Sequence, residues 1–320
     1  MLYFCLKAKS FFFYTASNPS IKNGGFLNES KKDIHPIIPP AYAARTLFFD
    51  LPQTASVVIE KVVEAGLTFP LIGKPNIGAR GRGVKILKTE ADIATFVQSA
   101  ALDFHIQEYI EYENEIGLFY YRFPGANKGT LSGIVRKEFL SVIGDGKQTV
   151  SQLLHADKRS LMYLSSLTTL AKDQLDQIPL LGEKRIISPF GNHARGALFL
   201  DDSHLIDQEL IDCFDAVCKQ IPDFYFGRLD IRYKSWEELK KGANFIIIEI
   251  NGAGAEPTHM YDPKHSLFYA WKEILRHWKI LYKISTANHS NGVPYLSYKE
   301  GVAMLREDKE WSKKLEAMPL

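Results

Sequence analysis

The chain has 320 residues, of which 46% are hydrophobic and 12% aromatic, a composition typical of a folded globular protein. The formal net charge of +2 at pH 7 gives no electrostatic reason to expect nucleic acid or an anionic membrane as a partner. The three cysteines form no metal-ligand or secreted-scaffold pattern, which fits a reducing cytosol. We therefore expect a cytoplasmic protein without nucleic-acid partners, and a homodimer on base rates alone.

Residues 1–45 are expected to form an N-terminal segment and a loop-rich connector. Apolar residues at positions 2–6 and 11–14 are interrupted by Lys7 and Lys9. The run is shorter than the roughly 20 residues that cross a bilayer, and it lacks a small-residue cleavage site. We expect neither a transmembrane segment nor a signal peptide, but a helix or strand packed on the main body. Contact with a membrane surface is a minor alternative.

Residues 46–110 are expected to form a small subdomain. The patterns predict, in chain order, a helix over 52–66, strands over 69–75 and 83–87, a helix over 89–101 and a strand over 105–110. The basic segment from Gly78 to Gly83 joins the first two strands. It lacks the Gly-Lys-Ser/Thr of a Walker A loop, and a strand rather than the helix of a dinucleotide fingerprint follows it, so we predict a hairpin loop. Its backbone could cradle phosphate, and Lys74, a charge in an apolar strand, needs a partner such as phosphate.

Residues 111–290 are expected to form a larger subdomain, and residues 291–320 a charged helical tail. The patterns predict strands over 115–122 and 133–142, a helix from 149 towards 177, extended segments over 185–200, a helix over 207–220, strands over 227–232 and 245–251, and a helix from 266 to about 286. Helices and hairpins mixed in this way, without regular βαβ alternation, favour the α+β class.

The last two predicted strands carry the residues on which the functional interpretation depends. Arg228 and Asp230 alternate with apolar residues and therefore share one face of their strand. Glu249 and Asn251 share one face at the end of the other strand. If the strands pair, the common face holds two carboxylates, an amide and a guanidinium, which suit Mg²⁺ and phosphate. The alternative for Asp230 and Arg228 is an ion pair worth about 0.2–1 kcal/mol.

Four further polar residues are candidates for substrate contact. His193 and Arg195 lie in a glycine-flanked loop and could touch an acylphosphate or a carboxylate substrate. Glu256 and His259 follow the strand of Glu249 and could contact an amine acceptor, which must lose a proton to react. A structural role in a loop is an equally weighted alternative for the two histidines.

In this order, the motifs between about residues 68 and 263 resemble those of the ATP-grasp superfamily, which includes D-alanine–D-alanine ligase and cyanophycin synthetase-like carboxylate–amine ligases. The resemblance implies two α+β subdomains that clasp a nucleotide, with the domain that usually precedes them reduced or absent. It implies ATP and Mg²⁺, or Mn²⁺, as cofactors. The whole chain most resembles uncharacterised stand-alone ATP-grasp proteins, so the identity of its carboxylate and amine substrates is not carried over.

The resemblance also implies roles for individual residues. The expected metal ligands are Asp230, Glu249 and Asn251, and the expected catalytic residues are Arg228, His193 and Arg195. The residues expected to bind the phosphates are Lys74, Gly78, Arg80, Gly81, Arg82, Gly83 and Lys137, with a solvated strand face as the alternative for Lys137. Those expected to bind the nucleoside are Glu108, Tyr109 and Ile110 for adenine and Glu115 for ribose. Lys31 is a further candidate for a nucleotide-binding lysine.

The implied reaction is that of an ADP-forming ligase. A carboxylate attacks the γ-phosphate of ATP to give an acylphosphate, and an amine or thiol then displaces phosphate. A kinase that stops after phosphoryl transfer and a non-catalytic ATP-binding module are the alternatives. The interpretation requires that Lys74, Glu108, Glu115, Asp230 and Glu249 line one cleft between two subdomains. The loop over residues 256–263 is expected to select the substrate.

Overall fold

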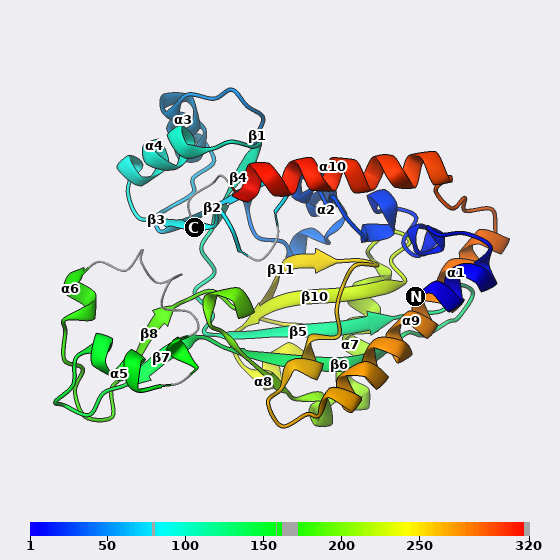
Figure 1. Ribbon diagram of the computed structural model, residues 1–320. Coiled ribbons are helices and arrows are strands. Elements are labelled where there is room, and N and C mark those ends of the chain that lie inside the picture. The colour runs from blue at the N-terminus through cyan, green and yellow to red at the C-terminus, as the bar shows by residue number, and fades with distance from the viewer. Residues whose placement is uncertain (79–80, 158, 162–171, 317–320) are drawn as a thin grey trace.

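The computed structural model describes residues 1–78, 81–157, 159–161 and 172–316. Two α+β parts, a small and a large subdomain, face a common cleft, and a long C-terminal helix reaches from one to the other (Figure 1). Every strand pairing between named strands is antiparallel. The predicted α+β class with two subdomains is confirmed. None of the helices in the described ranges is long and apolar enough to cross a membrane.

The small subdomain is a four-stranded sheet covered on one face by two helices. The strand order is β1-β4-β2-β3. The strands are β1 (Thr46–Phe49), β2 (Leu71–Pro75), β3 (Lys85–Leu87) and β4 (Phe104–Glu108), and the helices are α3 (Ala55–Glu64) and α4 (Glu90–Ser99). Thr89 caps α4 and forms a reciprocal capping box with Asp92. The predicted hairpin between β2 and β3 is confirmed, whereas β1 lies within a stretch for which no strand was predicted.

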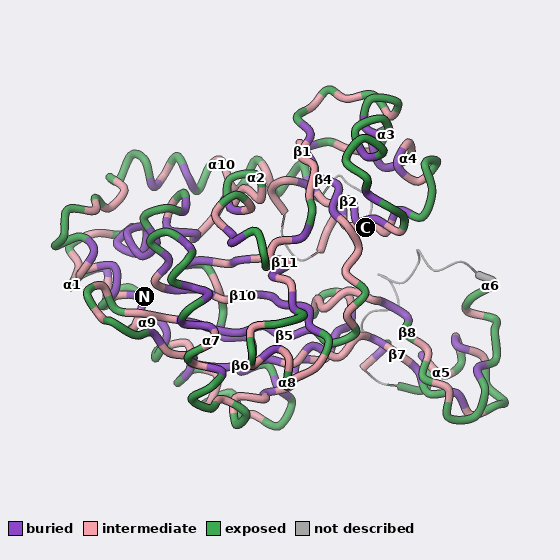
Figure 2. The backbone as a smooth tube through the Cα atoms, turned by 180° about the vertical axis from the view of Figure 1, so that it is seen from behind, coloured by how far each residue is buried: buried purple, intermediate pink, exposed green. Residues whose placement is uncertain are grey.

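The large subdomain is built on a five-stranded sheet of order β11-β10-β5-β6-β9. Its strands are β5 (Asn114–Tyr121), β6 (Thr130–Glu138), β9 (Leu198–Asp201), β10 (Phe226–Tyr233) and β11 (Phe245–Asn251). Figure 2 shows that β5, β6 and β10 are buried along most of their length. The helices α7 (Gln208–Lys219) and α8 (Trp236–Lys240) pack on one face of this sheet. Their apolar side chains and those of the strands form the main hydrophobic core of the large subdomain.

The side chains of β5 and β10 alternate between this core and the opposite face of the sheet. The apolar set in the core includes Ile116, Leu118, Leu229 and Ile231. On the opposite face, Glu115, Arg228 and Asp230 line the cleft, while Phe119 and Phe226 lie under α9 (Leu267–Ser290) and the N-terminal segment. One face of the sheet is therefore polar at the cleft and apolar farther along.

Strand β7 (Leu140–Ile143) pairs with β8 (Lys184–Ser188) outside the main sheet, next to α5 (Val150–Ala156) and α6 (Lys172–Leu175). The single strand predicted over 133–142 is therefore divided, because β6 and β7 join different sheets. The helix predicted from residue 149 ends at Ala156. Most of its expected continuation lies outside the described residues.

The N-terminal segment packs on the large subdomain, and the last helix connects it with the small subdomain. The N-terminal segment contains α1 (Leu2–Ala8), α2 (Lys31–Ile34) and 3₁₀ turns at Phe13–Ala16, Lys22–Gly25, His35–Ile37 and Pro40–Tyr42. Further 3₁₀ turns lie at His193–Arg195, Ser203–Leu205 and Thr258–Tyr261. Phe13 and Tyr14 are buried against α9, as expected for a segment that packs on the main body. The last helix, α10 (Tyr298–Glu316), crosses the N-terminal segment towards the small subdomain (Figure 1).

Candidate active site

A cleft of about 740 Å³ lies between the two subdomains. Its lining combines β2, the hairpin loop and β4 on one side with β5, β6, β10 and β11 on the other, and the N-terminal segment and α10 complete the wall. The sequence-predicted site residues that line it are Lys74, Gly78, Gly81, Arg82, Glu108, Tyr109, Ile110, Glu115, Lys137, His193, Arg228, Asp230, Glu249 and Asn251. Gly83 and Arg195 do not line it, and Arg80 lies outside the described residues.

Five charged residues form what we call the floor network of the cleft. Lys137 Nζ lies 3.0 Å from Glu115 Oε1 and 3.1 Å from Asp230 Oδ2. Arg228 contacts both oxygens of Asp230, at 2.8 and 3.2 Å, and Arg232 Nε lies 3.2 Å from Glu115 Oε2. Burial opposes ionisation of Asp230, but the charges of Arg228 and Lys137 lower its pKa to about 2. Asp230 is therefore ionised at neutral pH.

Two glycines leave room for the floor network. A Cβ added at Gly191 would lie 2.0 Å from Glu115 Oε1 and 2.8 Å from Lys137 Cδ. A Cβ at Gly117 would lie 3.0 Å from Arg228 Cδ. A side chain at either position would displace a charged group, so glycine lets the loop after β8 and strand β5 approach the network closely.

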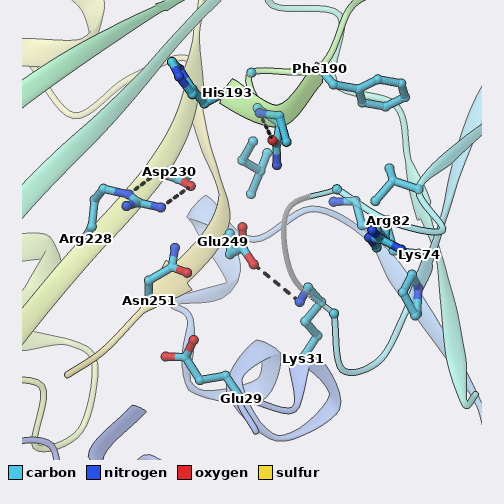
Figure 3. Close-up of a pocket in the computed structure, with 18 of the residues that line it drawn as sticks. Glu29, Lys31, Lys74, Arg82, Phe190, His193, Arg228, Asp230, Glu249 and Asn251 are labelled. Atoms are coloured by element: carbon cyan, nitrogen blue, oxygen red, sulfur yellow. Dashed lines mark hydrogen bonds and ion pairs between the residues drawn. The ribbon is translucent and has the colours of Figure 1, made fainter. Parts of the chain in front are cut away.

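The predicted pairing of the two strands that carry the candidate metal ligands is confirmed. Asp230 lies opposite Glu249 and Arg228 lies opposite Asn251. Glu249 projects into the cleft, where Lys31 Nζ lies 3.4 Å from its Oε1 (Figure 3). Asn251 Nδ2 is buried without a hydrogen-bond partner among the atoms described. Glu249 and Asn251 therefore present polar atoms to the cleft, whereas both oxygens of Asp230 are already held by cations.

The N-terminal segment is fastened to the loop that follows β11. The N–H groups of Ala253 and Gly254 donate to the carbonyl oxygens of Gly24 and Gly25, at 2.9 and 2.7 Å. A Cβ at Gly25 would lie only 2.7 Å from Gly252 Cα. Glycine at these positions allows the two backbones to touch, and the contact brings the residues after Gly25 into the cleft.

This contact supplies two charged residues to the site, one of them absent from the sequence-based set. Glu29 Oε1 accepts a hydrogen bond of 2.7 Å from Gly252 N. Burial raises the pKa of Glu29 to about 7, and the negative charge of Glu249 adds to the effect. Lys31, which the sequence offered as a further candidate for a nucleotide-binding lysine, contacts Glu249 (Figure 3). The only local signal for Glu29 was its place after the Asn-Gly-Gly turn.

On the opposite side of the cleft, Lys74 projects from β2 and donates to Gln107 Oε1 at 2.8 Å. Burial lowers the pKa of Lys74 to about 8, although Glu249 acts in the opposite direction. Its hydrogen-bond partner is neutral, so its charge is incompletely compensated. Gly81 and Arg82 from the hairpin loop line the same side. The arrangement offers positive charge and backbone N–H groups opposite Glu249.

Helix α10 forms a wall that was not expected from a charged tail. Trp311 and Leu315 line the cleft, and Leu315 packs against Leu102 of the small subdomain. Asn28 Nδ2 donates to Met304 O at 3.1 Å and thereby ties the N-terminal segment to the helix. Four lining residues have a buried polar atom without a hydrogen-bond partner in the described part of the chain: Asn28, Asn251, Thr258 and Trp311. Such atoms in a cleft are typical of a site that receives a polar ligand.

The structure places the two loop residues expected to act in catalysis differently. His193 lines the cleft, with its ring stacked on Tyr261 at 5.9 Å, and burial lowers the pKa of His193. Arg195 instead donates to Val84 O at 3.2 Å, and its guanidinium lies 4.4 Å from the centre of the Phe190 ring. Arg195 therefore connects the loop after β8 to the hairpin of the small subdomain.

The residues expected to hold the nucleoside are partly engaged by other residues. Arg45 donates to both oxygens of Glu108, at 2.8 and 2.9 Å. Both oxygens of Glu115 belong to the floor network, beneath Gly191. The side chain of Tyr109 lies 5.6 Å from the guanidinium of Arg232. A ribose hydroxyl would have to share the carboxylate of Glu115 with two cations.

The expectation that His259 contacts an amine acceptor does not agree with the structure. His259 is buried, does not line the cleft, and lies 3.1 Å from Glu273 Oε2. A Cβ at Gly133 would lie 2.2 Å from the ring, which shows how tightly β6 packs against it. His259 therefore has a structural role, which was the alternative considered from the sequence. Glu256 does line the cleft and accepts a hydrogen bond from Tyr261 Oη at 2.8 Å.

Comparisons with known proteins give matches among solved structures alone. No family model matches the sequence, and no curated protein matches it at the threshold applied. The D-alanine–D-alanine ligase from Bacillus anthracis matches with 14% identity and a TM-score of 0.46, over 82% of this chain and 69% of that chain. The bifunctional glutathione synthetase from Pasteurella multocida matches with 14% identity and a TM-score of 0.42, over 82% and 38%.

A third similar structure is the ATP-grasp ligase PsnB complexed with minimal precursor, with 14% identity and a TM-score of 0.39, over 74% of this chain and 55% of that chain. The chain thus spans between about a third and two thirds of the length of these ligases. They belong to the group that the sequence motifs resemble. All three TM-scores lie below 0.5, so we interpret the cleft from its own residues.

Proposed function

We infer that this chain belongs to the ATP-grasp superfamily, and we propose that it is an ATP-dependent ligase that joins a carboxylate to an amine. The observation that carries the proposal is the opposition of two charge patterns across one cleft. Lys74 and Arg82 lie on the small-subdomain side, and Glu249, Asn251 and the floor network lie on the other. Cationic side chains can bind the phosphates of a nucleoside triphosphate, and the oxygen ligands opposite them can bind the divalent metal ion that accompanies it.

The polar lining supports a nucleotide as the ligand. Lys74 lacks a counter-ion as its hydrogen-bond partner, and the phosphates of ATP would supply one. The glycines of the hairpin loop allow its backbone to approach the phosphates closely. Tyr109 and Ile110 follow β4 at the rim of the cleft and offer a ring, an apolar side chain and backbone groups to a base.

The oxygen ligands at the end of β11 fit Mg²⁺ only in part. Mg²⁺ is usually held by one or two protein oxygens together with phosphates and water. Glu249 and Asn251 could provide them through a carboxylate oxygen and the amide Oδ1, since both side chains line the cleft. Among the described residues, no cluster of three or more His, Cys, Asp and Glu could hold a metal ion without a ligand. We therefore propose that Asp230 orients Arg228. Asp230 could bind the metal ion only if its ion pairs with Arg228 and Lys137 were broken. Bound there, Mg²⁺ would neutralise charge on the phosphate oxygens.

The residues of this chain can promote both steps of the proposed reaction. In the first step, a carboxylate oxygen bonds to the γ-phosphorus and the bond to ADP breaks. In the second, the amine bonds to the acyl carbon, phosphate leaves and the nitrogen loses a proton. Arg228, fixed by Asp230 and by Glu256 O at 3.2 Å, can stabilise negative charge in both steps. Glu29 can accept the proton because its pKa of about 7 is close to neutral.

The test is an ATP-to-ADP assay with pooled amino acids, small peptides and polyamines, in which product masses are recorded. We expect ADP to form with a pool that contains both substrates, together with a product lighter by one water than their sum. Glu249→Gln should lower turnover by about two orders of magnitude or more, as expected for loss of a group at the reacting phosphates. Glu64→Gln, at the exposed end of α3, serves as the matched control.

Three outcomes would count against parts of the proposal. Equal turnover by Glu249→Gln and the parent chain would remove Glu249 from the site. ADP without any ligated product would favour a kinase. Binding of ATP without ADP formation in any pool would favour a non-catalytic ATP-binding module.

A further inference from the structure

The net charge of +2 conceals a strong segregation of charge along the chain. Residues 1–28 contain three Lys and no Asp or Glu, and residues 263–299 contain five Lys, one Arg and one Glu. Together these two segments hold nine basic and one acidic side chain, a balance of +8. The rest of the chain holds 30 basic and 36 acidic side chains, a balance of −6. The single acidic residue, Glu273, is buried.

The two segments lie together in the fold. Helix α1 packs on the C-terminal half of α9, where Phe4 and Tyr282 have ring centres 5.4 Å apart. Phe13 also contacts Trp278 at 6.2 Å. In Figure 1, α1 lies at the end of the large subdomain remote from α3 and α4, and α9 extends from there along the lower side of the large subdomain. Helices α1 and α9, with their basic residues, therefore lie together and away from the small subdomain.

Helix α9 carries an apolar stripe of which only one half is covered. Its members recur at intervals of three and four residues and thus share one face of the helix: Phe268, Trp271, Leu275, Trp278 and Tyr282. The N-terminal segment covers Trp278 and Tyr282. The side chains of Phe268, Trp271 and Leu275 are 76%, 51% and 59% exposed. On α1, Leu2, Tyr3 and Leu6 are exposed as well.

A row of cations runs beside the apolar stripe. Lys272, Arg276, Lys279 and Lys283 are spaced by four, three and four residues and are all exposed. Each follows or closely neighbours an apolar position of the stripe, so the cations lie on one side of it. Lys7 and Lys9 extend the positive charge to α1. We call the exposed side chains of α1 and α9, with these cations, the amphipathic face.

We propose that the amphipathic face binds membrane surfaces that contain anionic phospholipids. Exposed Trp, Phe and Leu with lysines beside them suit the boundary between headgroups and acyl chains. Each Lys or Arg near an anionic surface contributes about 1 kcal/mol of attraction at moderate ionic strength. Lys22, Lys264 and Arg276 form ion pairs with Glu307, Asp262 and Glu273, so the cations that complement such a surface are chiefly those of the lysines on α1 and α9.

Two other occupants fit this face less well. A second copy of the chain would bring the cation rows of two amphipathic faces together, which like-charge repulsion opposes. Nucleic acid would leave Leu2, Leu6 and Leu275 without a function, because phosphate and base contacts need charge, hydrogen bonds or stacking.

The proposal is tested by co-sedimentation of the full chain with vesicles of phosphatidylcholine alone or with about a third phosphatidylglycerol. We expect binding to the anionic vesicles at low ionic strength, at least tenfold weaker binding to neutral ones, and release at high salt. The variant Phe268→Ser/Trp271→Ser/Leu275→Ser should lose at least tenfold in affinity. Leu180→Ser/Leu181→Ser removes side chains that are 75% and 82% exposed elsewhere and should bind like the parent.

A charge variant keeps the test decisive if the apolar variant does not fold. Lys272→Glu/Lys279→Glu changes two exposed residues and should also abolish binding to anionic vesicles, with an unchanged circular dichroism spectrum. Equal binding by the charge variant and the parent, or no binding by the parent, would overturn the proposal. Concentration-dependent dimerisation that the apolar variant abolishes would identify a second copy as the occupant instead.

Discussion

At the scale of single residues, the charge of Lys74 depends on what lies in the cleft. Its side chain is half-buried, and its hydrogen-bond acceptor is the neutral amide of Gln107. Burial lowers the pKa of Lys74 to about 8. A phosphate next to the ammonium would favour the charged form and raise this pKa. Nucleotide binding above pH 8 should therefore require uptake of a proton.

We predict that the affinity for ATP weakens as the pH rises from 7 to 9.5. Above a pKa of about 8, the decline should approach a factor of about ten per pH unit, because binding requires the protonated lysine. In Lys74→Arg the guanidinium keeps its charge, so this decline should be largely absent. Isothermal titration calorimetry in buffers of different ionisation enthalpy measures both the affinity and the protons taken up. The same pH dependence in both proteins would contradict the assignment.

Glu29 gives a second prediction, on stability. Its pKa rises on folding from about 4.5 to about 7, so the folded state prefers the neutral acid. This preference contributes stability at acid pH and is lost as the pH rises through 7. Glu29→Gln, which has no such charge, should be more stable than the parent at pH 8 by about 1–3 kcal/mol and by much less at pH 5. Urea unfolding at the two pH values provides the measurement, and a difference that does not change with pH would refute it.

At the scale of elements, the loop after β8 and the β2–β3 hairpin are joined by Arg195. Its contacts with Val84 O and the Phe190 ring contribute about 1 kcal/mol each. Because Arg195 does not line the cleft, we expect a positioning role for the hairpin. Arg195→Met should raise the KM for ATP by about 5- to 30-fold and change kcat by less than about threefold.

The separate effects on the KM for ATP and on kcat distinguish a positioning role of Arg195 from direct participation in the reaction. A contact made only in the transition state would lower kcat by a factor of about 100 and leave the KM for ATP unchanged. Arg228→Met, which alters a guanidinium in the cleft, should show that second pattern and serves as the comparison.

At the scale of the whole molecule, a ligand bound between the subdomains should stabilise both of them. A non-hydrolysable ATP analogue at about 100 times its Kd contributes about 2.7 kcal/mol to the free energy of unfolding. We expect a rise in Tm of several degrees with the analogue, and a further rise with Mg²⁺ that EDTA reverses. In Glu249→Gln the Mg²⁺-dependent part should be lost while the nucleotide-dependent part remains. A Mg²⁺ effect of equal size in that variant would place the metal elsewhere.

The sequence was sufficient for those parts of the molecule in which the pattern is local. Alternation in β10 and β11 indicated which side chains share a face, and the glycine-rich segment before β3 indicated a hairpin. Strand β1 has four residues at a sheet edge and no alternating pattern, so it could not be distinguished from the connector. The amphipathic face was not predicted, because the net charge of +2 is the sum of a basic and an acidic part of the chain.

The rest of the site depends on contacts between distant parts of the chain. Glu29 lies in the cleft because its carboxylate binds Gly252 N, 223 positions away. Trp311 lies there because α10 packs on the N-terminal segment through Asn28 and Met304. Neither sequence neighbourhood indicates a ligand. Likewise, His259 looked available in its motif, and only the packing of β6 and Glu273 shows that it is enclosed.

The N-terminal segment and α10 together form one wall of the cleft, and this has a consequence while the chain is being translated. Asn28, Glu29 and Lys31 line the cleft together with Trp311 and Leu315 of α10, and Asn28 donates a hydrogen bond to a carbonyl of α10. A nascent chain translated only as far as residue 300 would have both sheets but a cleft open on one side. The floor network can assemble before α10 emerges from the ribosome, whereas a complete binding site cannot. Until then, the apolar side chains that α10 will cover are exposed to chaperones and to neighbouring nascent chains.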